Sequence, residues 1–394
     1  MVSSGGAVRL LLIRVRSTDL DCMSKVVELT TADEPRDVIH EAVQLLSEGK
    51  LVCLPSETIY LVACDALSAE GLQRLAVLAE RAPEAKCSLA VRDGDAAADY
   101  VPEMSDLGRR LCRRCWPGPV TLSFDQSAAG GLFDALPEAC RDLVMTGGRI
   151  RLSVPADDVV QSISRLMPNP LVMLGIQSVA QVPKTADDAE RLFGEDADLL
   201  IDGGTCRYGE AATEVHVSGD DWEMVFESVV TERTIRRLAS HVYLFVCTGN
   251  TCRSPMAEAM FRKMLTERLK CTEDELAERG HIVASAGIAA SMGSRPSPES
   301  VEIMQEKGID LHQHASQPLT GNLLQAADYV YTMTSGHRDS ILYEAPLAEE
   351  RVTVLAHDGT DISDPIGYGM DKYKECAEQI ERSLKAVMAD LFED

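Results

Sequence analysis

Residues 24–240 change repeatedly between helical and strand periodicity. Residues 39–50, IHEAVQLLSEGK, place apolar side chains at helical spacing and end near a glycine, and residues 71–83 keep this spacing up to a proline. Residues 51–66, LVCLPSETIYLVACDA, predict a strand, a turn and a second strand. Further short strands are expected at residues 88–93, 120–124, 149–154 and 213–218. This irregular order predicts an α+β domain with a mixed sheet.

Residues 241–394 follow a more regular pattern, in which apolar strands alternate with amphipathic helices. The pattern predicts a doubly wound α/β domain with a four-stranded parallel sheet and flanking helices. Ligands of such sheets bind at the carboxyl ends of the strands. The expected strands are residues 241–247, 281–287, 327–333 and 351–356, and the expected helices are residues 254–269, 297–308 and 371–392.

The length of the chain, 394 residues, also favours two domains. We place them at residues 24–240 and 241–394, after an N-terminal arm of residues 1–23 that we expect to be disordered. The boundary near residue 240 depends on the change of pattern alone. No apolar run reaches the length of a transmembrane helix, and the N-terminus lacks the pattern of a secretory signal, so we expect no membrane partner.

Charge and cysteine content narrow the function further. The formal net charge of −25 disfavours nonspecific nucleic-acid binding, although it leaves a local basic groove possible. The 12 cysteines are irregularly spaced in a long chain, which indicates a reducing cytoplasm. Cys112 and Cys115 form a CxxC pair without a second ligand pair, so we interpret them as structural and predict no metal site. His312 and His314 are expected at the surface.

The segment VCTGNTCRSP, residues 246–255, carries the strongest chemical signal. Backbone N–H groups of a short loop that curls into a helix can point at one centre and bind an anion there. Gly249 and Asn250 suit left-handed backbone angles, and Arg253 can clamp phosphate oxygens. The expected phosphate-binding residues, from the loop and the start of the helix, are Thr248, Gly249, Asn250, Thr251, Cys252, Arg253 and Ser254.

Cys247 lies where the predicted strand becomes this loop. The helix dipole, the loop N–H groups, Arg253 and a hydroxyl from Ser254 all favour its thiolate form. A thiolate beside a phosphate nest can attack phosphorus and form a phosphocysteine. The segment lacks GxxxxGK[ST], which excludes a nucleotide-hydrolase P-loop, and the chemistry needs no cofactor.

Residues 242–391 resemble the low-molecular-weight protein phosphatase family. The resemblance is carried by FVCTGNTCRSPMAEAMF, by SAG at 285–287, by ADYVYTMT at 327–334 and by DPIG at 364–367. It implies that Cys247 is the nucleophile, that Arg253 binds the phosphoryl group and that Asp364 is the general acid. Asp358 and Asp361 are nearby rivals of Asp364, but neither precedes a proline.

The family contains both tyrosine and arginine phosphatases, which act on phosphorylated proteins. Tyrosine-directed members usually carry a bulky aliphatic residue where this chain has Thr251, whereas arginine-directed members resemble this sequence. We therefore favour phosphoarginine over phosphotyrosine. Ile366 departs from both patterns, which usually place an aromatic residue after Asp-Pro, and this argues against a substrate ring stacked on an aromatic wall. Thr251 and Ile366 are the two candidate specificity positions.

Cys252 has two interpretations. It could capture an oxidised Cys247 as a disulfide and so act as a redox partner. It could equally be a small buried residue beneath the loop.

Residues 35–235 resemble the YrdC-like threonylcarbamoyl-AMP synthases, through LPSETIYLVACDA, WPGPVTL, IDGG and ATEVHV. Four positions still match the family's nucleotide cleft: Thr58, Tyr60, Lys86 and Thr213. The departures are Glu80 and Ala82 at basic positions, Leu61 at a glycine, Ser153 at an arginine, and Gly175, Ile176 and Gln177 in place of Ser-Ala-Asn.

Loss of several phosphate contacts implies a degenerate cleft in this domain. Three alternatives stay open: a scaffold or sensing domain, a synthase for tRNA modification that makes the protein bifunctional, or a module that binds a nucleotide or RNA. ATP and Mg²⁺ would be cofactors only if the domain is active.

Overall fold

The computed structural model describes residues 25–29, 35–82, 84–178 and 182–392. The predicted arm, residues 1–23, lies outside this described part. The chain divides into two compact units, residues 1–235 and 236–394, and the division falls within one helix, α7. None of the helices in the described ranges combines the length and the apolar character that a membrane span needs.

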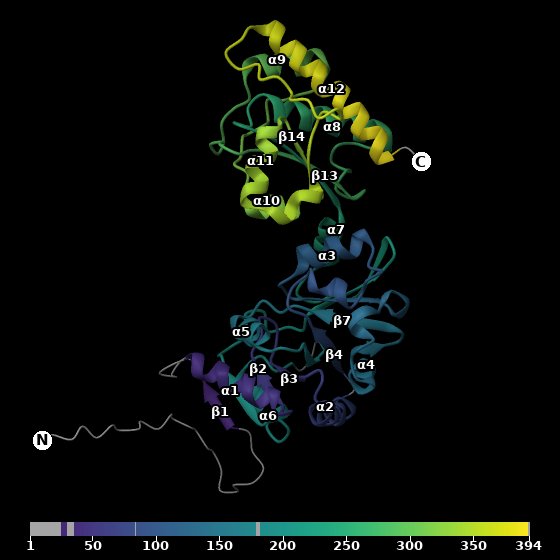
Figure 1. The fold of residues 1–394 in the computed structure, drawn as a ribbon, viewed down its shortest axis with the longest axis vertical. Helices are drawn as coiled ribbons and strands as arrows, with labels where there is room; N and C mark the ends of the chain where they lie inside the picture. Colours follow the sequence, from purple (N-terminus) through teal and green to yellow (C-terminus); the bar gives the residue numbers. More distant parts are fainter. Residues whose placement is uncertain (1–24, 30–34, 83, 179–181, 393–394) are drawn as a thin grey trace, which may run out of the picture. The chain divides into compact units, whose positions relative to one another are not determined.

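The N-terminal unit is built on a mixed sheet, as predicted (Figure 1). Strands β2 and β3 pair antiparallel and confirm the predicted strand–turn–strand segment. The strands run in the order β1-β9-β2-β3-β8-β4-β7-β5-β10-β11, and β6 pairs with β7. The strands are β1 (Lys25–Glu28), β2 (Val52–Leu54), β3 (Leu61–Asp65), β4 (Ala85–Ala90), β5 (Val120–Asp125), β6 (Met145–Thr146), β7 (Arg149–Ser153), β8 (Leu171–Ile176), β9 (Leu199–Asp202), β10 (Thr213–Ser218) and β11 (Asp221–Phe226).

Four helices of this unit, α2, α3, α5 and α6, begin at a polar side chain that caps the first turn. In α2, the Ser68 side chain accepts a hydrogen bond from the Gly71 N–H, while Leu72, Leu75 and Leu78 are buried. The helices are α1 (Pro35–Ser47), α2 (Ala69–Arg81), α3 (Asp106–Cys115), α4 (Glu138–Val144), α5 (Asp158–Leu166), α6 (Ala186–Phe193) and α7 (Glu232–Ala239).

The C-terminal unit contains a four-stranded parallel sheet in the order β13-β12-β14-β15, which confirms the predicted doubly wound fold. Its strands are β12 (His241–Cys247), β13 (His281–Gly287), β14 (Tyr329–Thr332) and β15 (Val352–Val354). Its helices are α8 (Arg253–Leu269), α9 (Pro298–Glu306), α10 (Gly321–Ala326), α11 (Ser335–Glu344) and α12 (Met370–Phe392).

Strand β12 is buried on both faces, which explains its continuous apolar sequence. Tyr243 and Phe245 pack into one core, with residues of α8, α9 and α12. Leu244 and Val246 point the other way and pack with residues of α10 and α11. The two cores hold β12 in the middle of the sheet, so that its carboxyl end, Cys247, opens into the loop ahead of α8.

Candidate active site

Cys247 lies at the base of the loop between β12 and α8, and its residue is only 3% exposed. The Ser254 hydroxyl lies 3.0 Å from its Sγ, and the Asn250 backbone N–H donates to Sγ at 3.2 Å. Both groups can stabilise a thiolate, because each presents a hydrogen to the sulfur. The predicted curl of the loop around this sulfur is therefore present.

Asn250 holds the loop in this shape. It is fully buried, with φ of 53°, so it adopts the predicted left-handed conformation. Its Nδ2 donates to Ser254 Oγ at 2.9 Å and to Ser285 Oγ at 2.8 Å, while its Oδ1 accepts from the Gln317 N–H at 2.9 Å. A left-handed conformation was also expected for Gly249, and this prediction was wrong, because Gly249 does not have positive φ. The atom nearest to a Cβ added at Gly249 would be Thr251 Oγ1, at 3.6 Å.

The loop rests on the SAG segment that ends β13. A Cβ at Gly287 would lie 2.5 Å from the Thr248 carbonyl oxygen and 2.9 Å from the Asn250 nitrogen, so only glycine allows this approach. The Ile288 N–H donates to the Cys247 carbonyl at 3.0 Å. These contacts tie the loop to the neighbouring strand.

Polar residues on the side of Asn250 away from Cys247 support it, and the quoted motifs contain Ser285 and Glu258 without indicating this role. Ser285 donates to Glu258 at 2.6 Å, and the His314 ring lies 3.0 Å from the Asn250 carbonyl oxygen. The expected surface position of His314 was therefore wrong, because its side chain is 11% exposed, whereas His312 is exposed as expected. Glu258 lies in the quoted motif, but it supports the loop by accepting a hydrogen bond from Ser285 in β13, and the local sequence does not reveal that these two residues are neighbours.

His337 at the start of α11 contacts the other side of the loop. Its Nε2 lies 2.9 Å from Thr248 Oγ1, and its Nδ1 lies 2.9 Å from Thr334 Oγ1. Burial and, secondarily, the charge of Arg253 lower the pKa of His337 below its ordinary value. The neutral imidazole is favoured, so this residue orients the Thr248 hydroxyl without adding a charge.

Arg253 and Asp364 face each other at the mouth of the site. The Arg253 guanidinium, 5% exposed, donates to Asp364 Oδ2 at 2.5 Å and to the Ile362 carbonyl at 3.3 Å. The Asp364 side chain is 46% exposed. The two other candidate acids make hydrogen bonds elsewhere: Asp361 accepts a hydrogen bond from the Ser335 N–H, and Asp358 accepts one from the Thr360 hydroxyl.

The predicted specificity and redox positions border the same loop. Thr251 is half-buried, and its carbonyl accepts from the Ser297 N–H at 2.9 Å. Cys252 is buried, with its Sγ 3.4 Å from the Tyr373 hydroxyl, so it packs beneath the loop as a free thiol. Ile366 is 61% exposed, and its N–H donates to Asp364 Oδ1.

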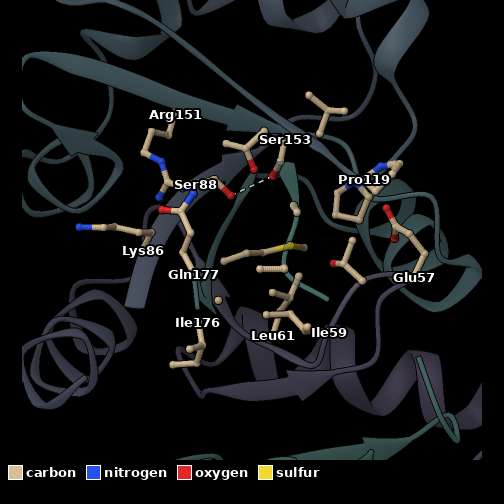
Figure 2. Close-up of a pocket in the computed structure, with 18 of the residues that line it drawn as sticks. Glu57, Ile59, Leu61, Lys86, Ser88, Pro119, Arg151, Ser153, Ile176 and Gln177 are labelled. Atoms are coloured by element: carbon tan, nitrogen blue, oxygen red, sulfur yellow. Dashed lines mark hydrogen bonds between the residues drawn. The ribbon is translucent and has the colours of Figure 1, made fainter. Parts of the chain in front are cut away.

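The N-terminal unit contains a small cavity of about 60 Å³ (Figure 2). Two of the four expected cleft residues, Thr58 and Lys86, line it. Tyr60 and Thr213 do not: the Tyr60 hydroxyl donates to the Gly204 carbonyl at 2.8 Å, and the Thr213 hydroxyl bonds the Val230 backbone. The hydroxyls of Tyr60 and Thr213 therefore stabilise neighbouring backbone segments.

Two basic side chains line the cavity, Lys86 and Arg151, and a carboxylate neutralises the arginine. Arg151 forms two hydrogen bonds to the Glu214 carboxylate, at 3.1 and 2.9 Å, and Gln177 donates to the same carboxylate. Ser88 and Ser153 bond each other at 2.9 Å (Figure 2). This guanidinium is thus already paired, which disfavours a triphosphate in the cavity.

The CxxC cysteines, Cys112 and Cys115, are both buried in the core. Burial raises the pKa of Cys115 to about 12, so its thiol stays protonated and inert. Over the described ranges no cluster of three His, Cys, Asp or Glu side chains has the geometry of a metal site.

The parallel sheet and the cysteine loop at its carboxyl edge define a cysteine-dependent phosphatase. Residues 242–394 match the family model described as low molecular weight phosphotyrosine protein phosphatase. Residues 44–227 match the Sua5/YciO/YrdC model, which is described as telomere recombination.

Known relatives share the C-terminal unit. A protein-arginine-phosphatase from Bacillus subtilis is 38% identical over 155 residues, which are 38% of this chain and 97% of the relative. A probable low molecular weight protein-tyrosine-phosphatase, EpsP, from Ralstonia nicotianae is 35% identical over 36% of this chain and 90% of the relative. A crystal structure of a YwlE mutant from Bacillus subtilis is 36% identical, with a TM-score of 0.34, over 39% of this chain and 99% of that one. The chain therefore belongs to the low molecular weight phosphotyrosine protein phosphatase family through this unit, which is fused to a Sua5/YrdC domain.

Proposed function

We propose that this protein removes phosphoryl groups from phosphorylated protein side chains, preferring phosphoarginine over phosphotyrosine, through a phosphocysteine at Cys247. The observation that carries the proposal is the placement of one sulfur between the Ser254 hydroxyl and the Asn250 N–H, at the start of the helix that also presents Arg253. A nucleophile, an anion nest and a cationic clamp then converge on one phosphoryl group.

In the first step, the Cys247 thiolate attacks phosphorus and forms an S–P bond. The P–N bond of phosphoarginine, or the P–O bond of phosphotyrosine, breaks, and its electron pair goes to the leaving atom. Asp364 supplies the proton that this atom needs, which its exposed position at the mouth of the site allows. Arg253 exchanges its contact with Asp364 for the phosphoryl oxygens.

In the second step, Asp364, now a carboxylate, takes a proton from water. The hydroxide so formed attacks phosphorus, the S–P bond breaks, and its electron pair returns to Cys247 as the thiolate. Inorganic phosphate leaves, and Ser254 again donates its hydroxyl to the sulfur.

Thr251 supports the preference for phosphoarginine. Its side chain is half-buried on the loop, so a hydroxyl stands where a larger aliphatic group would crowd a planar guanidinium. The name of the Bacillus subtilis relative agrees with this preference, whereas that of the Ralstonia relative does not. Ile366, strongly exposed beside Asp364, offers the substrate an aliphatic surface in place of an aromatic wall.

The test compares two peptides of one sequence that carry either phosphoarginine or phosphotyrosine, at equal concentration. We expect faster phosphate release from phosphoarginine, no release by Cys247→Ser, and a kcat lowered about 100-fold or more by Asp364→Asn. Thr251→Ile should lower kcat/KM for phosphoarginine at least tenfold more than for phosphotyrosine. Asp361→Asn is the matched control, because that carboxylate bonds the Ser335 N–H instead. Preference of the unmodified protein for phosphotyrosine would overturn the specificity, and release by Cys247→Ser would overturn the mechanism.

For the N-terminal unit we propose a ligand-binding module without synthase activity. The supporting observation is the Arg151–Glu214 pair, which occupies a guanidinium in the cavity wall. Calorimetric titration with MgATP, with and without threonine and bicarbonate, tests this proposal. Threonine-dependent ATP turnover would refute it and support the bifunctional alternative.

A further inference from the structure

A groove of about 660 Å³ in the C-terminal unit is lined by residues of α8 and α12 and by Lys307 and Ile309. Its apolar lining is rich in methionine: Met260 is buried, and Met264 and Met388 are partly buried. Methionine side chains are flexible and polarisable, so this lining adapts to the shape of an apolar partner. None of the described residues that line this methionine groove belongs to the candidate active site.

The methionine groove is positively charged. Its cationic lining residues are Lys263, Arg268, Lys307 and Lys385, and its acidic ones are Glu267 and Glu381. Lys307 and Lys385 donate to the Glu381 carboxylate at 2.5 and 2.8 Å and lower the pKa of this group to about 2, so it stays ionised. Lys263 and Arg268 donate to backbone carbonyls, at 2.8 and 3.0 Å, which does not neutralise their charges. A positive groove favours an anionic partner.

The end of α11 and the turn after it form an exposed apolar patch on the same unit. Tyr343 is 90% exposed and Leu347 is 92% exposed, so both side chains project into solvent. Three exposed acids lie beside them in the chain: Glu344, Glu349 and Glu350. Of these, Glu349 lies 3.6 Å from Arg338. We call these two apolar and three acidic residues the Leu347 patch. Large apolar side chains that are exposed together and rimmed by polar residues are typical of an interaction site.

The methionine groove and the Leu347 patch lie on opposite faces of the parallel sheet. Helices α8 and α12 pack in the core that contains Tyr243, whereas α11 and Ala348 pack in the core that contains Leu244. Figure 1 shows α12 and α11 on different sides of the C-terminal unit. The patch of one chain therefore cannot enter its own groove, and a contact between the two surfaces must join separate copies.

We propose that copies of this chain bind head to tail, with the Leu347 patch of one copy in the methionine groove of the next. Tyr343 and Leu347 then contact the methionine side chains, and the three glutamates of the patch face the cations of the groove. The groove volume is within the range of small-molecule sites, about 300–1,000 Å³, so it has room for both apolar side chains.

Complementary charge favours a second copy as the occupant. Whole chains with a net charge of −25 repel each other, so association depends on a local match between an acidic surface and a basic one. The Leu347 patch supplies exposed carboxylates and the methionine groove supplies an excess of cations. Since each bound copy keeps one patch or one groove unused, the contact is heterologous and can repeat. Its small area predicts weak association that depends on concentration.

Sedimentation velocity of the full-length protein, with a thiol reductant present, measures this association. We expect the average mass to rise with protein concentration and to pass twice the mass of one chain. Leu347→Ser, which removes an apolar anchor, and Lys385→Glu, which reverses a charge of the groove, should each lower the association constant about tenfold or more. Both side chains are exposed, so both variants should fold and melt like the unmodified protein. Tyr343→Ser tests the patch at a second exposed position.

Two control variants carry the same kinds of change away from these surfaces. Lys374→Glu reverses another lysine of α12, which pairs with Glu306 and does not line the groove. Val77→Ser removes an exposed apolar side chain from the N-terminal unit. Neither substitution should change the association constant.

A mixture of Leu347→Ser with Lys385→Glu separates this contact from general aggregation. The first variant keeps an intact groove and the second an intact patch, so the mixture should form pairs and nothing larger, because each pair exposes only the two altered surfaces. A monomeric unmodified protein at every concentration would overturn the proposal and would indicate an acidic segment of another protein as the occupant. Association that survives both substitutions, equal weakening in the controls, or a mixture that forms no pairs would overturn it as well.

Discussion

Replacing Asn250 tests whether one buried side chain shapes the phosphate loop. Asn250→Ala removes the two bonds donated to Ser254 and Ser285 and leaves the Gln317 N–H without its acceptor. The lost bonds cost about 1 kcal/mol each and the orphaned N–H about 1–3 kcal/mol. An alanine at φ of 53° adds about 1 kcal/mol. The expected total, about 4–6 kcal/mol, is a large part of the stability of a typical domain.

Asn250→Gly separates the two contributions, because glycine adopts positive φ freely but also lacks the side-chain bonds. We expect it to be about 1 kcal/mol more stable than Asn250→Ala and still far less stable than the unmodified protein. Urea unfolding followed by far-UV circular dichroism measures both variants. Tryptophan fluorescence serves as an internal control, since Trp116 and Trp222 both belong to the N-terminal unit.

The result that would refute this reasoning is a loss below about 1 kcal/mol in both variants, because three buried bonds could not then be supporting the loop. Equal stability of the alanine and glycine variants would refute only the backbone contribution. An unchanged fluorescence transition beside a weakened dichroism transition would locate the loss in the C-terminal unit.

Three further predictions concern residues around the same loop. Gly287→Ala should lower the unfolding free energy by about 1–3 kcal/mol, because its Cβ meets backbone atoms at 2.5 and 2.9 Å, whereas Gly249→Ala should change it by less than about 0.5 kcal/mol in urea unfolding. After peroxide oxidises Cys247 to a sulfenic acid, Cys252 should displace water and form a disulfide; Cys252→Ser should then recover less activity than the unmodified protein when thiol is added, and equal recovery would exclude this role. The pKa of His337 is lowered in the folded state, so the unfolded state binds this proton more readily and the free energy of unfolding should fall as pH drops below about 6.5. His337→Gln should reduce that loss when unfolding is measured at a series of acid pH values. An identical pH profile of the two proteins would contradict the assignment.

The alternation of apolar strands with helices along residues 241–394 was sufficient to predict the parallel sheet, and the continuous apolar run of β12 was sufficient to place Cys247 at its carboxyl end. The support of Asn250 by His314 and Gln317 could not be predicted in this way. These residues lie 64 and 67 positions from Asn250 in the chain, in an irregular segment without periodicity. Long-range packing alone brings them under the loop.

Long-range packing also explains why the residues expected in the N-terminal cleft do not all line one cavity. Thr58 and Tyr60 are two residues apart, and the motif predicted a shared cavity, yet only Thr58 lines it. The Tyr60 hydroxyl reaches the segment after β9, which pairs with β2 in the sheet. Motif spacing predicts that residues are close together, but the pairing of distant strands decides which side each of them faces.

The contact between Arg253 and Asp364 joins binding and catalysis in the proposed mechanism. The two residues are 111 positions apart in the chain, and Arg253 Nη2 donates to Asp364 Oδ2 at 2.5 Å. In the proposed mechanism, an incoming phosphoryl group replaces Asp364 as the partner of the Arg253 guanidinium. The net affinity for the phosphoryl group is weakened, because the bond between Arg253 and Asp364 is lost. The same exchange releases the carboxyl group beside the leaving atom, where protonation is needed. Part of the energy of phosphoryl binding is thereby used to position the carboxyl group of Asp364. A change that weakens the pair between Arg253 and Asp364 should therefore raise the affinity for phosphate and lower the rate of turnover.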